Sequence, residues 1–233
     1  MALAVLAALA GAAVQSASGL GFALVLSPVL FAVLEPAEAV TAVLLLGMVL
    51  CSLVLVESRG VATHGLGRLL VPAVPGLGLG LLVITALSKE SLQVGVGVAV
   101  IAAAAWQLRH RAPIRVPAVA AGFLSGALTT SISVNGPPLA LWLESERVPP
   151  EVFRTTLAAA FLILDVAGVA LIVSSQGLDT IDLGVLAPLL AAVVAGYALG
   201  AVAFRRLDPD RFSAVVLVVV ICTGIASVLG GIL

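Results

Sequence analysis

The sequence has little charge for its length. Of its 233 residues, only 10% are Asp, Glu, Lys or Arg, and the formal net charge is −1. Soluble domains carry about 25% charged residues, because their surfaces must be hydrated. The chain therefore lacks the polar material to cover a globule in water, which excludes a soluble fold. It also lacks a basic cluster, which argues against nucleic acid as a partner.

Side chains that carry enzymatic chemistry are equally scarce. The two histidines, His64 and His110, fall in charged gaps between apolar runs and form no H-E-x-x-H pattern of a zinc hydrolase. A membrane protease with two aspartates is also excluded, because Asp165 is the only Asp deep in an apolar run. Cys51 and Cys222 lie within apolar runs and are expected to be buried thiols, not a disulfide. The sequence predicts no enzyme, no metal site and no cofactor.

Long apolar runs make up most of the chain. Hydrophobic residues make up 62% of the chain, and runs long enough to cross a bilayer follow one another with short polar gaps. This pattern predicts an all-α polytopic membrane protein with one integral membrane domain. The apolar segments are 2–34, 37–56, 66–88, 91–108, 116–143, 152–174, 183–204 and 212–233.

The two halves of the chain resemble each other. The stretch GAAVQSASGLG (11–21) aligns without a gap on GALTTSISVNG (126–136). Pro36, Thr41 and Cys51 then fall opposite Pro150, Thr155 and Asp165, and Gly76-x3-Gly80 falls opposite Gly196-x3-Gly200. We interpret residues 1–112 and 113–233 as two four-segment repeats, an arrangement common in transporters. The paired glycines are expected to allow close helix packing.

Segments 2–34 and 116–143 differ from the others, because each is long and is interrupted by Gly, Ser and Pro. If both enter and leave the membrane on one side, ten of the eleven Lys and Arg residues share a face and only Lys89 lies opposite. If all segments cross once, there is no bias. The positive-inside rule favours the first arrangement, with both termini outside.

Each of these two segments is therefore expected to be a re-entrant or broken helical hairpin. Two full crossings would leave about 15 residues per helix, short of the roughly 20 that a bilayer requires. A hairpin plus three spans gives each repeat an odd number of crossings. The two repeats are then inverted, and their hairpins approach from opposite faces.

The hairpin tips are the candidate binding site. After each polar tip a helix restarts, and Asn135-Gly136 is expected to cap one that begins at Pro137 or Pro138. Two helix N-termini would converge near the membrane centre, where free N–H groups favour an anion. An alternative is that the Ser and Thr hydroxyls only pack helices and bond to their own backbone. The candidate substrate-binding residues are Gln15, Ser16, Ser18, Gly19, Gly21, Thr130, Ser131, Ser133, Asn135 and Gly136.

Two charged residues of segment 152–174 are further candidates. Asp165 has no cation beside it in sequence. Placing a carboxylate within the membrane costs free energy, so such a residue is a candidate for a functional role. It is expected either to carry a coupling proton or to hold a hydrogen bond to a tip hydroxyl. Arg154, at the start of the same segment, is expected to attract anions at the cytoplasmic mouth or to anchor the helix at the interface.

The tips and their flanking prolines, SASGLGFALVLSPVL (16–30) and SISVNGPPLALWL (131–143), resemble the sulfite exporter TauE/SafE family of membrane permeases. The resemblance covers essentially the whole chain, although Val134-Asn135-Gly136 stands where that family usually has a Gly-Gly doublet before the proline. It implies export of small sulfur-containing anions such as sulfite or organosulfonates.

Together these observations predict a secondary transporter that exports such an anion by alternating access about the two tips. The membrane potential would favour export by about 2.3 kcal/mol per charge for each 100 mV. An anion channel, or an importer of another small organic anion, remains an alternative with the same fold. We expect a multi-pass protein of the plasma membrane whose partners are its anion and membrane lipid, with a homodimer left open.

Overall fold

The computed structural model describes residues 1–108, 116–203, 221, 224–225 and 227–232. Every regular element among them is helical, as the apolar runs predict. The helices are α1 (Ala2–Ser18), α2 (Phe22–Val33), α3 (Pro36–Glu57), α4 (Leu66–Ala86), α5 (Lys89–Leu108), α6 (Ala118–Ile132), α7 (Gly136–Ser145), α8 (Pro150–Gln176), the short 3-10 turn η1 (Leu178–Thr180) and α9 (Leu183–Ala203). Most of the segment predicted at 212–233 lies outside the described residues.

Four of the described helices are long and apolar enough to cross a membrane, namely α3, α4, α8 and α9. Three shorter apolar helices, α1, α2 and α6, accompany them. The mean hydropathy of the four long helices lies between 2.0 and 2.8, far above that of helices on a water-facing surface. The all-α, multi-pass membrane fold expected from composition is therefore confirmed.

Segments 2–34 and 116–143 each form two helices joined by a short break. In the first, Gly19 and Gly21 have φ angles of 82° and 128°, a region that favours glycine because it has no Cβ. In the second, Ser133 adopts a φ of 58°, which is uncommon for a residue with a side chain. We call residues 19–21 tip 1 and residues 133–135 tip 2.

Glycines bring two pairs of helices into close contact. Along α9, Gly196 faces the carbonyl of Leu9 and Gly200 faces that of Ala13, so that α9 runs parallel to α1. Along α4, Gly76 faces the carbonyl of Phe123 and Gly80 faces that of Ala127, so that α4 runs parallel to α6. A Cβ at these positions would collide with backbone, which confirms the close-packing role expected of these glycines.

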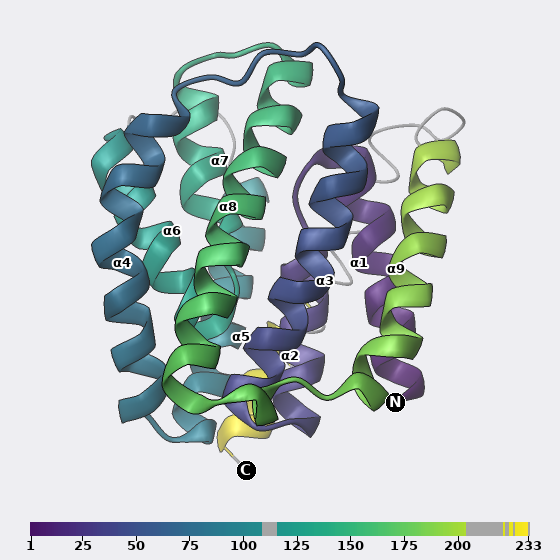
Figure 1. Ribbon diagram of the computed structural model, residues 1–233, viewed down its shortest axis with the longest axis vertical. Coiled ribbons are helices and arrows are strands. Elements are labelled where there is room, and N and C mark those ends of the chain that lie inside the picture. The colour runs from purple at the N-terminus through teal and green to yellow at the C-terminus, as the bar shows by residue number, and fades with distance from the viewer. Residues whose placement is uncertain (109–115, 204–220, 222–223, 226, 233) are drawn as a thin grey trace.

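These two pairs flank a central pair. Helices α3 and α8 lie side by side at the middle of the bundle, with α4, α6 and α7 on one side and α1 and α9 on the other (Figure 1). Helices α1 and α6 run in opposite directions, since α1 follows α9 upward in this view and α6 follows α4 downward. The interior is built from small and branched apolar residues of α1, α2, α3 and α8.

The charged residues separate between the two ends of the bundle. At one end, Glu57 pairs with Arg154 and His64 pairs with Glu146; at the other, Lys89 pairs with Glu35. The N-terminus and the described residues 227–232 lie at the Lys89 end (Figure 1). We call the two ends the arginine end and the lysine end. The described Arg residues at the arginine end are Arg59 after α3, Arg68 in the first turn of α4, Arg147 between α7 and α8, and Arg154 near the start of α8.

The predicted cation count also includes Arg109, Arg111, Arg115, Arg205, Arg206 and Arg211, which lie outside the described residues. Within the described residues, the two hairpins nevertheless enter the bundle from opposite ends. The first begins and ends at the lysine end, where Met1 and Leu34 lie, whereas the second begins and ends at the arginine end. Each hairpin thus returns to the end from which it starts.

Candidate functional site

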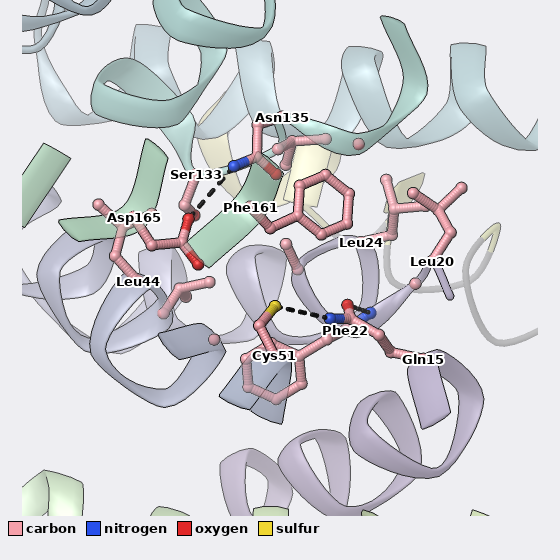
Figure 2. Close-up of a pocket in the computed structure, with 16 residues that line it drawn as sticks. Gln15, Leu20, Phe22, Leu24, Leu44, Cys51, Ser133, Asn135, Phe161 and Asp165 are labelled. Atoms are coloured by element: carbon pink, nitrogen blue, oxygen red, sulfur yellow. Dashed lines mark hydrogen bonds between the residues drawn. The ribbon is translucent and has the colours of Figure 1, made fainter. Parts of the chain in front are cut away.

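The two tips meet at a small cavity between α3 and α8, shown in Figure 2. Its volume is about 30 Å³, room for water molecules but little more. Both restarting helices reach it, because Phe22 of α2 and Gly136 of α7 contribute to its wall. The lining residues are Gln15, Leu20, Gly21, Phe22, Ala23, Leu24, Val43, Leu44, Gly47, Cys51, Ser133, Val134, Asn135, Gly136, Phe161 and Asp165.

Tip 1 brings backbone donors to this cavity. The first turn of α2 begins at Phe22, and the first helical hydrogen bond is donated by Val25 to the Gly21 carbonyl at 3.2 Å. The N–H groups of Phe22, Ala23 and Leu24 therefore have no partner within the helix. Gln15 Oε1 accepts the one from Phe22 at 3.3 Å. Ala23 and Leu24, which carry the other two N–H groups, both line the cavity.

Gln15 also connects tip 1 to the central helices. Its side chain is buried in α1, and its Nε2 donates to the Cys51 thiol of α3 at 3.6 Å (Figure 2). A hydrogen bond to sulfur is weak, so this amide is only lightly held. Gln15 can therefore exchange the thiol for a stronger acceptor without losing a strong bond.

Tip 2 is built differently. Asn135 stands at the N-cap position of α7, but its side chain makes no capping bond and instead donates from Nδ2 to Asp165 Oδ1 at 3.2 Å. The expectation that Asn135 caps this helix is therefore wrong, and α7 begins at Gly136, one residue earlier than expected. Pro137 and Pro138 carry no N–H, so only Gly136 offers a backbone donor in the first three positions.

Asp165 lies on α8 at the centre of the bundle. The residue is 5% exposed, and its Oδ2 lies 2.7 Å from the position a Cβ on Gly47 would take. Its partner is the Asn135 amide and not the tip hydroxyl that was one of the two expectations. Within the described residues, no Lys, Arg or His forms an ion pair with it. An ionised carboxylate in this position would be costly, because burial without a counter-charge removes its hydration.

The hairpins touch each other beside the cavity. The hydroxyls of Ser27 and Ser133 lie 2.7 Å apart, so a bond joins α2 directly to tip 2. Leu20 of tip 1 packs against Gly136, where any side chain would collide with it. The contact is buried, because Ser27 and Ser133 are 0% and 1% exposed. Movement of one tip therefore changes the packing of the other.

The structure brings together only some of the expected substrate-binding residues. Gln15, Gly21, Ser133, Asn135 and Gly136 line the cavity, as does Asp165. Three of the remaining hydroxyls donate to backbone carbonyls of helices. Ser16 donates to the Ala13 carbonyl, Ser131 to the Ala127 carbonyl and Thr130 to the Leu77 carbonyl of α4. These three follow the alternative interpretation, in which hydroxyls satisfy and pack the helices.

Ser18 lines a second hollow of about 460 Å³ at the arginine end, and the neighbouring Gly19 packs against Arg154, which also lines it. We call this hollow the vestibule. Arg154 forms part of its wall, and its backbone and side chain pack against Gly19. The residues that line the vestibule are Ala17, Ser18, Glu57, Ser58, Val61, Pro150, Glu151, Phe153, Arg154 and Thr155.

Sequence reasoning missed Cys51 and the two aromatic rings as components of the cavity wall. Cys51 was expected to be only a buried thiol, and it is 1% exposed, yet it faces both Gln15 and the cavity. Its position opposite Asp165 in the repeat was the available signal. Nothing in the sequence distinguished Phe22 and Phe161, because the sequence of an apolar run does not show which apolar side chains face a cavity.

Comparison with known families decides the assignment. Residues 3–227 match the family described as Sulfite exporter TauE/SafE. The chain belongs to this family. The match covers nearly the whole chain and includes both hairpins, so the family resemblance is confirmed. Neither curated proteins nor solved structures give a significant match. This TauE/SafE protein is accordingly a multi-pass membrane protein of a transporter family.

Proposed function

We propose that this protein is a secondary transporter that exports a small sulfur-containing anion, such as sulfite or an organosulfonate. The observation that carries the proposal is the meeting of two helix starts, Phe22 of α2 and Gly136 of α7, at one buried cavity. Helix N-termini present N–H donors and the positive end of the helix dipole. Family membership supports a sulfur oxyanion as the substrate.

The donors around the cavity suit an oxyanion. The N–H groups of Ala23 and Leu24 come from one side, and the amides of Gln15 and Asn135 come from the other elements. Sulfite and sulfonate groups carry three oxygens, each able to accept such bonds. The apolar remainder of the wall excludes water, which strengthens each hydrogen bond to the anion.

Asp165 must be neutral when the anion is bound, because two negative charges in one buried cavity repel. In this proposal Asp165 carries a proton while the cavity is occupied. If Asp165 keeps that proton throughout the cycle, the anion moves alone and the membrane potential drives export. If it releases the proton, proton and anion cross together in the same direction.

Alternating access is proposed to follow from two inverted repeats. Helices α1 and α6 run in opposite directions, and each hairpin returns to a different end of the bundle. A cavity of about 30 Å³ is too small for an anion of four or more heavy atoms. We propose that displacement of one tip widens the cavity toward one face, and that displacement of the other tip opens it to the opposite face.

The arginine end is proposed to face the cytoplasm, which places both termini outside a plasma membrane. Four described arginines lie there against a single lysine at the other end, and the positive-inside rule assigns the richer end to the cytoplasm. Arg154 would then attract anions on the cytoplasmic side. Each exported charge would gain about 2.3 kcal/mol per 100 mV of membrane potential.

The test is flux of radiolabelled sulfite from proteoliposomes with an imposed potential and, separately, an imposed pH gradient. Efflux that saturates, shows counterflow and follows the sign of the potential supports an electrogenic carrier. Flux that follows only the pH gradient supports proton–anion symport, for which Asp165→Asn should abolish the pH dependence. Unsaturated conductance would instead establish a channel, and no flux of any sulfur anion would refute the proposal.

A further inference from the structure

A polar cluster closes the vestibule beside tip 1. Arg154 Nη2 donates to Glu57 Oε2 at 2.6 Å, joining the start of α8 to the end of α3. Tyr197 of α9 donates its hydroxyl to the same oxygen at 2.9 Å. The side chains of Arg154 and Glu57 are 25% and 40% exposed, so the pair remains accessible from the vestibule. The cluster therefore joins three helices at the wall of one open hollow.

Glu57 does not satisfy Arg154 fully. The Nε of Arg154 is buried, and no hydrogen-bond partner is found for it among the described residues. A buried donor without a partner is destabilising, so its persistence points to an acceptor that is present only at times. A guanidinium presents its donors as a fork that fits the oxygens of a carboxylate or another oxyanion in pairs.

Arg154 also determines the position of tip 1. Its Cα and Cγ both lie 3.4 Å from the position that a Cβ on Gly19 would occupy. Gly19 ends α1 and Leu20 lines the central cavity, so tip 1 is the thin wall between vestibule and cavity. Whatever moves the Arg154 side chain therefore acts directly on this wall.

The aligned positions of the other repeat carry no charge. The alignment of Pro36 with Pro150 places Val40 opposite Arg154 and Leu171 opposite Glu57, and that of Gly76 with Gly196 places Leu77 opposite Tyr197. Val40 packs in the same apolar core as Val134 of tip 2, where both are buried. The ion pair of Arg154 and Glu57 therefore has no counterpart at the aligned positions of the other repeat.

We propose that Glu57 is an internal substitute for the transported anion. It occupies Arg154 while the vestibule is empty, and an anion arriving from the arginine end displaces it. The guanidinium then holds the anion at tip 1, the Glu57 carboxylate turns to solvent, and the contact between Arg154 and Gly19 loosens. The vestibule is thus a first binding site for an oxyanion on the path to the central cavity. This inference rests on the proposed transport function.

The test is the KM and Vmax of labelled sulfite transport in proteoliposomes for a set of charge variants. Glu57→Gln removes the competing carboxylate and should lower KM about twofold to fivefold, the factor expected for a partly exposed ion pair. Arg154→Gln should raise KM about tenfold or more, as for a lost hydrogen bond to a charged group. In the double variant KM should equal that of Arg154→Gln, because in this proposal Glu57 affects anion binding through its ion pair with Arg154.

The matched control is Glu146→Gln, which removes a carboxylate at the same end, paired with His64, outside the vestibule. Its KM should not change. If Glu57→Gln does not fold, Glu57→Asp weakens the pair by shortening the side chain and should lower KM by a smaller factor.

Wild-type transport separates the two possible failures. An unchanged or raised KM in the folded Glu57 variant, with wild-type sulfite transport intact, overturns the role of Glu57 alone. If the wild-type protein transports neither sulfite nor a sulfonate, the proposed function itself fails.

Discussion

The two hairpins occupy equivalent places in the fold but contribute different chemistry. Tip 1 turns through two glycines with positive φ and leads into a helix whose first three residues all carry N–H groups. Tip 2 turns through Ser133 and leads into Gly136-Pro137-Pro138, in which two of the three lack an N–H. The backbone of tip 1 is suited to holding an anion, whereas tip 2 provides side chains.

Side-chain bonding follows the same division. In hairpin 2, Ser125 donates to the Asn135 carbonyl at 2.9 Å, and the Asn135 amide donates to Asp165. In hairpin 1, the side-chain bond to the central helices is the long contact between Gln15 and the Cys51 thiol. Similar tip sequences have therefore diverged into a lightly held donor and a firmly held partner for a carboxylate. We expect tip 1 to move more readily.

The largest effect is expected from Asn135→Asp, which places a second carboxylate at the position that now donates to Asp165. Two carboxylates at this separation cannot both ionise when buried, and the shared negative charge would repel an anion. Sulfite transport at neutral pH should fall about 100-fold or more, in line with the cost of an uncompensated buried charge. Asn135→Ala, which loses the amide but adds no charge, should retain more activity; equal loss in both would contradict the electrostatic explanation.

Gly21→Ala tests the backbone of tip 1. The φ of 128° is unfavourable for alanine, and the new Cβ would lie 2.5 Å from Val14 Cγ1. The free energy of unfolding should fall by about 1–3 kcal/mol, as for strained backbone. Gly60→Ala is the matched control, with a φ of 88° but no atom within 4 Å of the new Cβ. If thermal unfolding shifts equally in both variants, steric crowding at the tip plays no part.

Ala23→Pro converts the start of α2 toward the pattern of α7, because residue 23 aligns with Pro138. Proline is tolerated in the first turn of a helix, so the fold should survive while one N–H is lost. Sulfite KM should rise about tenfold, the cost of a hydrogen bond to a charged group. Ala23→Ser, which keeps the N–H, is the control. A proline variant with wild-type KM would show that this N–H does not contact the anion.

The reciprocal change, Pro138→Ala, is expected to have the smallest effect. It returns an N–H to α7, but Asn135 and Asp165 already occupy that side of the cavity. Sulfite KM should fall no more than about threefold, the gain of one ordinary hydrogen bond. If Pro138→Ala lowers the KM for sulfite by a larger factor than Ala23→Pro raises it, the backbone of tip 2 and not that of tip 1 is the main donor to the anion.

Sequence alone was sufficient for features that depend on local chemistry. Apolar runs placed the helices, and Gly, Ser and Pro marked the breaks after Ser18 and Ile132. The spaced pair Gly76 and Gly80 predicted close packing because only small residues let backbones approach.

The direction of side chains could not be predicted in the same way. Thr130 and Ser133 lie three positions apart in one polar stretch, yet Thr130 bonds to α4 while Ser133 lines the cavity. That difference depends on which helix packs against α6 and on the left-handed turn at Ser133. Asn135 was expected to cap a helix through its side-chain oxygen, but Pro137 and Pro138 at the second and third positions of α7 have no N–H to donate to it. Its Nδ2 group donates to Asp165. The observed partners of Thr130 and Asn135 lie on α4 and α8, and a single sequence does not contain such long-range contacts.

The central claim is that the cavity between the tips binds a sulfur oxyanion while Asp165 is protonated. The most direct measurement is calorimetric titration of the purified protein with sulfite and with a matched carboxylate, across a range of pH. The account predicts that sulfite binds more tightly than the carboxylate, that its affinity rises as pH falls, and that Asp165→Asn binds sulfite with no pH dependence beyond that of the sulfite itself. Absence of sulfite binding at every pH, or an unchanged pH dependence in Asp165→Asn, would contradict it.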